Sequence, residues 1–221
     1  MKRGERPIPI RPADPRDAES LARLHFTCSH AQPGGFMHRL GPRFFLAYYR
    51  ILLREPTTVI LVADAGRDGV LGFVSATLDS KRQLEAIRRR RLGLLVAAIP
   101  ALIRTPGLLW DVYLRNRSLS PGAMGEGFGI SSGARIAYWG WLPTHPSHGQ
   151  ATLLIREVLR TLASLGASTV RLETDRVNRK VEVMHRLLGA RVVESLVTRD
   201  GRERIVFEYA LGPTAGQAPA R

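Results

Sequence analysis

The chain has 221 residues, of which 44% are hydrophobic and 24% are charged. These proportions are ordinary for a folded globular protein, and they exclude a disordered or collagen-like chain. Lys and Arg number 33 against 19 acidic residues, a formal net charge of +14, which favours an anionic partner such as nucleic acid, anionic lipid or a phosphorylated small molecule.

The length suits one mixed domain with a sizeable core, which we expect over residues 1–211. Cys28 is the single cysteine, so the chain can form neither an intramolecular disulfide nor a cysteine-based zinc site. The N-terminal segment MKRGERPIPIRP is positively charged but lacks the apolar run of a signal peptide. We therefore expect a cytoplasmic protein.

The first 80 residues predict a strand, two helices and a hairpin. PIPIR forms the short strand, and Asp14 caps a helix that starts with Pro15 and runs to about Thr27. After the polar loop CSHAQPGG, the segment GPRFFLAYYRILLRE places Phe45 and Tyr49 at helical spacing. TTVILVADA and GVLGFVSATLD, joined by GRD, predict two antiparallel strands.

A basic helical insertion is predicted at about residues 81–130. Residues 81–117 contain nine Lys or Arg against Glu85 and Asp111. The apolar run 92–103 is too short to span a bilayer and is interrupted by Pro100, so we expect it to pack against the core or to lie on a surface.

The second half of the chain predicts alternating strands and helices. After the Gly- and Ser-rich segment SLSPGAMGEGFGISSG, we expect a strand in ARIAYWGWLP, a helix after HPSHG, a strand in STVRLETD and a helix in NRKVEVMHRLLGA. RVVESLVTRDGRERIVFEYAL predicts a hairpin that turns at Asp200 and Gly201. The tail 212–221 is expected to be disordered.

The turn HPSHGQA, at the start of the helix that follows the strand 134–143, has features of a phosphate site. Backbone N–H groups at a helix start attract anions, and Gly149 and Ala151 have little side chain to block a close approach. A glycine before a helix is also an ordinary turn, and these residues alone do not separate the two interpretations.

Two blocks of the sequence resemble the Gcn5-related N-acetyltransferase (GNAT) superfamily. LPTHPSHGQATLL supplies Gly149 and Ala151 of the family's cofactor motif, with Pro146 at the position of its Arg or Gln. In DRVNRKVEVMHRLLGARVV, Asn178 matches the family's second block, and His185 stands where the family often has a tyrosine.

The resemblance covers residues 134–211 well and 8–80 loosely. It implies an α/β (α+β) fold, with a central mixed, mostly antiparallel sheet flanked by helices and with the basic insertion between the third and fourth strands. The segments YWGW and DGRERIVFEYAL also resemble members that accompany surface-polysaccharide synthesis.

The resemblance implies direct transfer of an acetyl or other acyl group from acyl-CoA to a primary amine. Backbone groups of the strand before the turn would pair with the pantetheine arm, and those of the turn would hold the pyrophosphate. The residues expected to bind the cofactor are Trp141, Leu142, Ser147, His148, Gly149, Gln150, Ala151, Thr152 and Asn178. Asn178 could equally cap the helix that follows it.

Two side chains are candidates for proton transfer. His185 could protonate the departing thiolate, because imidazole titrates near neutrality; the alternative is a partly exposed helix histidine with no role. Glu173 could accept the proton of the amine, or it could be an exposed strand glutamate. Tyr138, Trp139 and Trp141 either pack in the core or line an acceptor pocket.

The acceptor stays open at this point. The basic insertion would suit a nucleotide-linked amino sugar, while a protein or antibiotic amine would keep the same enzyme class. His145 and His148 have no third ligand nearby, so we expect no metal site.

Two readings outside the enzyme class also remain. Pro146 and His185 motivate a degenerate binding module without turnover. Residues 81–104 could form a solvated basic face, or a docking surface for an anionic substrate or a membrane; nucleic acid is not expected, because no aromatic residues interleave with the charges.

Overall fold

The computed structural model describes residues 8–30, 36–110, 113, 132–145, 148–197 and 202–212. Its strands are β1 (Ile10–Pro12), β2 (Thr58–Asp64), β3 (Val70–Thr77), β4 (Arg135–Trp141), β5 (Thr169–Asp175), β6 (Arg191–Val197) and β7 (Glu203–Ala210). Its helices are α1 (Ala18–Ser29), α2 (Phe36–Arg39), α3 (Pro42–Leu52), α4 (Ser80–Arg89), α5 (Arg91–Arg104), α7 (Ala151–Ser164) and α8 (Arg179–Leu187), with single 3-10 turns η1 (Pro15–Asp17), η2 (Gly66–Asp68) and η3 (His148–Gln150).

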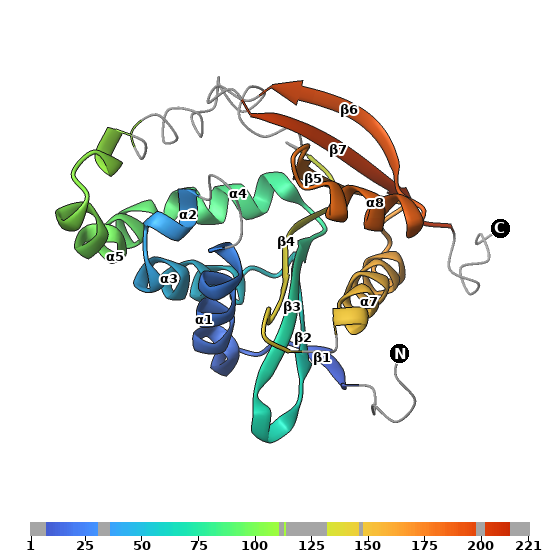
Figure 1. Cartoon of the computed structure of the whole chain (residues 1–221), viewed down its shortest axis with the longest axis horizontal. Helices are drawn as coiled ribbons and strands as arrows, with labels where there is room; N and C mark the ends of the chain where they lie inside the picture. The colour runs from blue at the N-terminus through green and yellow to red at the C-terminus, as the bar shows by residue number, and fades with distance from the viewer. Residues whose placement is uncertain are drawn as a thin grey trace.

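The strands form one mixed sheet in the order β1-β2-β3-β4-β5-β7-β6. Every neighbouring pair is antiparallel except β4 and β5, which are parallel. Helices α1 to α5 lie on one side of β1–β4 and helices α7 and α8 on the other (Figure 1). The predicted fold class, a mostly antiparallel mixed sheet flanked by helices, is confirmed.

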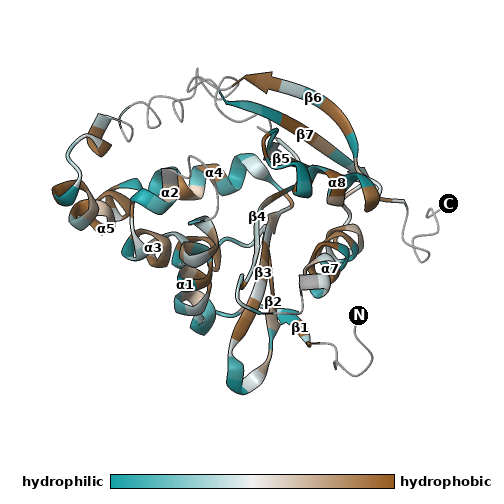
Figure 2. Cartoon of the chain, viewed as in Figure 1, coloured by the Kyte–Doolittle hydropathy of each residue, from teal (hydrophilic) through white to brown (hydrophobic). Residues whose placement is uncertain are grey.

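The two faces of the sheet carry separate apolar clusters, because successive side chains of a strand point to opposite faces. Phe73 of β3 packs with Leu21, Phe45 and Tyr49 on the face covered by α1 and α3. The strands β2 and β3 are predominantly hydrophobic along their length (Figure 2), as expected for strands that are covered on both faces.

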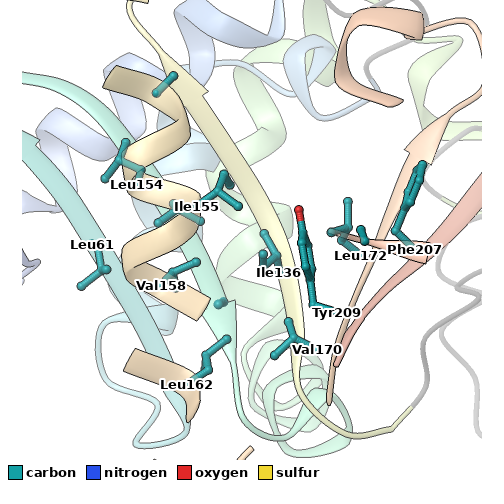
Figure 3. Close-up of a cluster of buried hydrophobic side chains, with 14 of the residues drawn as sticks. Leu61, Ile136, Leu154, Ile155, Val158, Leu162, Val170, Leu172, Phe207 and Tyr209 are labelled. Atoms are coloured by element: carbon teal, nitrogen blue, oxygen red, sulfur yellow. The ribbon is translucent and has the colours of Figure 1, made fainter. Parts of the chain in front are cut away.

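On the other face, α7 supplies a buried stripe of four side chains at helical spacing. This stripe faces Ile136 of β4 and Val170 of β5 (Figure 3), and it consists of Leu154, Ile155, Val158 and Leu162. Tyr209 and Phe207 of β7 complete the same cluster. The core thus ties α7 to both halves of the sheet.

Local signals in the first 80 residues led to correct predictions. The Asp14 carboxylate accepts a hydrogen bond from the backbone N–H of Arg16 at 2.6 Å, and Asp17 accepts one from the Asp14 N–H at 2.8 Å, which together make a capping box. The β2–β3 hairpin is present, with η2 at GRD. The short helix α2 was not anticipated.

Two helices follow β3, as predicted for the first part of the insertion. Ser80 begins α4 and is fixed to the segment before β4, because its hydroxyl and its backbone N–H both donate to the Gly133 carbonyl at 2.7 and 3.0 Å. The helix α5 continues through Pro100. The tertiary contacts of α5 outweigh the loss of one backbone hydrogen bond at proline.

Some predictions fall on residues outside the described ranges. These are residues 111–112 and 114–131 of the insertion, Pro146 and Ser147 in the turn, the β6–β7 turn at Asp200 and Gly201, and the tail from residue 213. Within the described ranges, none of the helices has the length and apolar character needed to cross a membrane.

Candidate active site

The parallel strands β4 and β5 pair at a single position and then diverge. Arg135 is registered with Arg171, whose N–H donates to the Ala134 carbonyl at 3.0 Å. Immediately afterwards β4 contains one extra residue, Ala137, because Ser75 of β3 opposes Tyr138 while Ala76 opposes Ile136. A bulge of this kind bends the strand that contains it, so the divergence is built into β4.

The divergence leaves backbone groups of β4 directed toward β5. The Leu142 N–H donates to the Leu71 carbonyl of the β3 side at 2.7 Å. Because the hydrogen-bonding groups of a strand alternate between its two edges, the N–H and C=O groups of Trp139 and the N–H of Trp141 point to the opposite edge. The Trp141 carbonyl accepts a hydrogen bond from the Cys28 thiol at 3.4 Å. An extended chain with amide groups could add to this edge.

The predicted cofactor residues Trp141 and Leu142 are packed at the end of β4. Gly72 of β3 makes room for the Trp141 indole, since a Cβ at Gly72 would lie 2.3 Å from the ring. The indole Nε1 is buried and has no hydrogen-bond partner among the described residues. Leu142 contacts both apolar clusters. These side chains fix the strand whose backbone faces the opening.

In the turn before α7, some of the predicted cofactor residues are exposed and others are buried. Gly149 is exposed, and a Cβ there would meet nothing within 4 Å. Gln150 is turned away, because its Oε1 accepts a hydrogen bond from the Ile8 N–H at 2.8 Å. Ala151 is buried in the core, and the Thr152 hydroxyl donates to the Gly149 carbonyl at 2.9 Å. Neither buried side chain is available to a ligand, so any role of Gln150 and Ala151 would be a backbone role.

A groove of about 360 Å³ runs between α7 and α8. Its lining residues are Thr152, Arg156, Lys180, Val183, Met184, Leu187 and Leu188. Two of them, Arg156 and Lys180, are cations that the sequence reasoning did not select. Lys180 lies in the first turn of α8, where the N-terminal end of the helix dipole also favours an anion, and Arg156 lies in the second turn of α7. The groove therefore suits phosphate groups.

Asn178 lies at the start of α8, but its side chain does not cap the helix. The capping interpretation is therefore wrong for this residue. The Asn178 carbonyl accepts a backbone hydrogen bond from Glu182 at 3.1 Å, which continues the helix.

His185 lies fully buried on α8, between the two diverging halves of the sheet. Its ring meets Trp139 of β4 edge-on at 6.4 Å between centroids, and its Nδ1 lies 2.7 Å from the Tyr209 hydroxyl of β7. The alternative interpretation, a partly exposed helix histidine, is therefore wrong about its exposure. The burial follows from the apolar neighbours on β4 and β7, which are distant in sequence.

Burial keeps both members of the His185–Tyr209 pair uncharged at neutral pH. It lowers the pKa of His185 to about 4 and raises the pKa of Tyr209 well above its ordinary value. The Nε2 atom of His185 is buried without a hydrogen-bond partner among the described residues. In the tautomer in which Tyr209 donates to Nδ1, Nε2 carries the ring proton and is free to donate it.

Glu173 projects from the other face of β5. Val170 and Leu172 belong to the cluster beneath α7 and α8, so the alternation of the strand places Glu173 on the opposite side from His185. Its carboxylate accepts a hydrogen bond from the Arg204 guanidinium at 3.1 Å, and its side chain is only 12% exposed. The description of Glu173 as an exposed strand glutamate is therefore wrong.

Comparison with solved structures identifies the fold. An acetyltransferase of the GNAT family from Streptococcus pneumoniae matches with a TM-score of 0.55 at 14% identity, over 92% of this chain and 99% of that one. An aminoglycoside 6'-acetyltransferase matches at 0.56 and 13%, over 93% and 98%. The Escherichia coli N-acetyltransferase that acts on an alanine of a ribosomal protein matches at 0.53 and 13%, over 96% and 99%.

These matches show that the chain has the fold of GNAT-family acetyltransferases over nearly its whole length. No protein-family model matches the sequence, and no curated protein matches it significantly. The matches give no support to the resemblance with proteins of surface-polysaccharide synthesis.

Proposed function

We propose that the chain is an N-acyltransferase that takes an acetyl or other acyl group from acyl-CoA and transfers it to a primary amine. The observation that carries the proposal is the opening between β4 and β5, with His185 Nε2, which has no hydrogen-bond partner in the described part of the chain, buried beside it. The GNAT-like fold supports the same class of reaction.

Acyl-CoA would lie along three parts of the chain: β4, the turn before α7 and the groove between α7 and α8. The N–H and C=O groups of Trp139 and the N–H of Trp141 would pair with the amides of the pantetheine arm, and the N–H groups of the turn around Gly149 would face the pyrophosphate. Arg156 and Lys180 would neutralise phosphate charge in the groove. The bound thioester supplies an activated acyl group.

His185 would act on the sulfur as the carbon–sulfur bond breaks. The ring is neutral in the resting protein, and its Nε2–H would donate a hydrogen bond to the thioester sulfur. As negative charge develops on the sulfur, the ring would take up a second proton from water, and the imidazolium would give one proton to the departing thiolate and return to its neutral form. The charge on the leaving thiolate favours a protonated imidazole nearby and so opposes the effect of burial. Tyr209 would hold the ring in the tautomer that presents this proton.

Glu173 would accept the proton of the attacking amine, from the face of the sheet opposite to His185. The amine must be unprotonated to attack the carbonyl, and a carboxylate can accept its proton directly or through water. With His185 on the α8 side and Glu173 opposite, acceptor and leaving group would occupy different faces of the opening. Glu173 must then act from within its ion pair with Arg204.

The acceptor is proposed as a primary amine, with its class to be found by experiment. The solved acetyltransferases of this fold include one named for an aminoglycoside and one for a protein alanine. For this chain we propose a nucleotide-linked amino sugar, because its phosphate groups would be attracted by the net charge of +14. A polyamine would be repelled by that charge.

Replacing His185 by Gln tests the mechanism. We expect turnover to fall by about 100-fold or more, while the Kd for acetyl-CoA changes little, because the phosphate contacts remain. The measurement is release of free CoA thiol with acetyl-CoA and a panel of nucleotide amino sugars, aminoglycosides and peptides, beside calorimetric binding of acetyl-CoA.

His25→Gln is a matched control for this substitution. His25 is also fully buried and bonds a tyrosine hydroxyl through Nδ1, with 2.8 Å to Tyr49, but it lies on the α1 side of the sheet. The His25→Gln variant should be less stable than the wild type, but its turnover per folded molecule should be unchanged. Equal turnover of His185→Gln and wild type would remove His185 from the mechanism. Acetyl-CoA binding without thiol release from any acceptor would favour the degenerate binding module.

A further inference from the structure

The helix α5 is apolar on two opposite faces. One face is packed: Leu94 and Ala98 are buried, and Ala98 lies in a cluster with Leu40 and Leu108. At 100° per residue these positions lie on the side of the helix that meets α3. This contact accounts for one apolar face only.

The opposite face of α5 carries a second apolar stripe that is open to solvent. It consists of Leu92, Leu95, Val96, Ile99 and Ile103, whose spacing confines them to roughly 100° of the helix surface. Leu92 and Ile103 are each 73% exposed and Val96 is 64% exposed. The helix lies at the edge of the molecule away from α7 and α8 (Figure 1), and hydrophobic residues make up much of its ribbon (Figure 2).

Cations flank this stripe at both ends of the helix. Arg89, Arg90 and Arg91 precede it and are exposed, and exposed Arg104 ends it. In the described residues 80–110, the acidic side chain is Glu85, which lies 3.8 Å from Arg89. The surface therefore combines exposed hydrocarbon with excess positive charge.

Two exposed aromatic residues continue the apolar surface beyond α5. Trp110 is 63% exposed and stacks on Tyr113, with 5.4 Å between the ring centroids. Trp and Tyr are the side chains that concentrate at the boundary between hydrocarbon and water in a bilayer.

We propose that the outer stripe of α5, with its flanking arginines, docks the protein on an anionic lipid surface. The helix would lie in the plane of the interface, with the stripe in the acyl boundary and the guanidinium groups at the lipid phosphates. Charge complementarity selects this occupant, because an uncharged apolar partner would leave the arginines unpaired, and a nucleic acid backbone would leave the hydrocarbon stripe exposed. The proposal does not depend on the acyltransferase activity.

Vesicle sedimentation of the full chain tests the proposal. Wild-type protein should sediment with phosphatidylcholine vesicles that contain phosphatidylserine, less with pure phosphatidylcholine, and less as salt is raised. The triple variant Leu92→Gln, Val96→Gln and Ile103→Gln should partition at least about tenfold less onto the anionic vesicles. The separate variant Arg90→Gln with Arg91→Gln should reduce partition by about tenfold.

A second triple variant tests whether the effect is specific to α5, because it removes exposed apolar side chains from other parts of the molecule. Leu165→Gln, Val177→Gln and Val197→Gln replace residues of similar exposure outside α5, and this protein should bind vesicles as the wild type does. All substituted residues are exposed, so each variant should fold, which circular dichroism would verify.

Four results would overturn the proposal. Wild-type protein could fail to bind anionic vesicles, or the α5 triple variant could bind them as well as the wild type. The third is a concentration-dependent dimer in sedimentation velocity that the α5 triple variant abolishes, which would assign the stripe to a second copy of the chain. Duplex DNA binding that the α5 triple variant weakens as much as vesicle binding would likewise contradict a lipid surface.

Discussion

Lowering the pH toward 4 is expected to remove about 3 kcal/mol of unfolding free energy through each of two buried histidines. Burial lowers the pKa of His25 to about 3 and that of His185 to about 4, from an ordinary value of 6.5. The unfolded chain therefore binds protons at these sites over a pH range in which the folded chain does not. The stabilisation is present in full above pH 6.5 and is lost as the pH falls toward the folded-state values.

The measurement is denaturant unfolding at several pH values between 7 and 4. His25→Gln and His185→Gln can each hydrogen-bond their tyrosine but cannot titrate, so each should flatten the slope of unfolding free energy against pH by about half. Asp17, Asp64 and Glu208 add a smaller loss at the acid end of this range, because arginine contacts lower their folded pKa values below the ordinary values of 3.8 and 4.5 and the unfolded chain is protonated at these sites first. This part is common to wild type and variants, so the comparison of slopes isolates the histidines. An unchanged slope in both variants would mean that the imidazoles are not held neutral.

Reversing charge in the groove between α7 and α8 is expected to weaken acetyl-CoA binding strongly. Arg156→Glu and Lys180→Glu should each raise the Kd by about tenfold, and the double variant by about 100-fold, because each places a carboxylate where the proposal puts phosphate. Calorimetry with acetyl-CoA measures the effect. Both side chains are exposed, so folding should be preserved.

Arg160→Glu separates local from global electrostatics. Arg160 is an exposed residue of α7 four positions beyond Arg156, outside the groove, where it pairs with Glu157. The substitution Arg160→Glu changes the net charge of the protein by the same amount as Arg156→Glu, and it should alter the Kd for acetyl-CoA by less than about threefold. A weakening as large as that of Arg156→Glu would show that the groove holds no specific anion.

Sequence signals within one segment predicted the elements well. The capping residue Asp14 and the GRD hairpin each depend on neighbours a few positions away, and, apart from the short helix α2, the described strands and helices appear where they were expected. The motif around Gly149 also led to a turn with an open backbone position. Local chemistry was sufficient in these cases.

The properties that make the opening a candidate site depend on distant contacts. The extra residue Ala137 is visible only in the register between β3 and β4. The side chain of Gln150 accepts a hydrogen bond from the backbone of Ile8, which lies 142 positions away in the sequence. The burial of His185 arises from Trp139 and Tyr209, on two different strands. A single sequence does not reveal such pairings, so the partner, pKa and exposure of His185 had to come from the structure.

Calorimetric titration of the wild-type chain with acetyl-CoA tests the central claim most directly. We expect saturable binding of acetyl-CoA at one site and competition by free CoA. Gly149→Glu should weaken the affinity by at least about tenfold, because the new carboxylate would face phosphate. Gly149→Ala should change the affinity far less, because the space beside Gly149 is open. Absence of saturable binding for acetyl-CoA, free CoA and a longer acyl-CoA would contradict it.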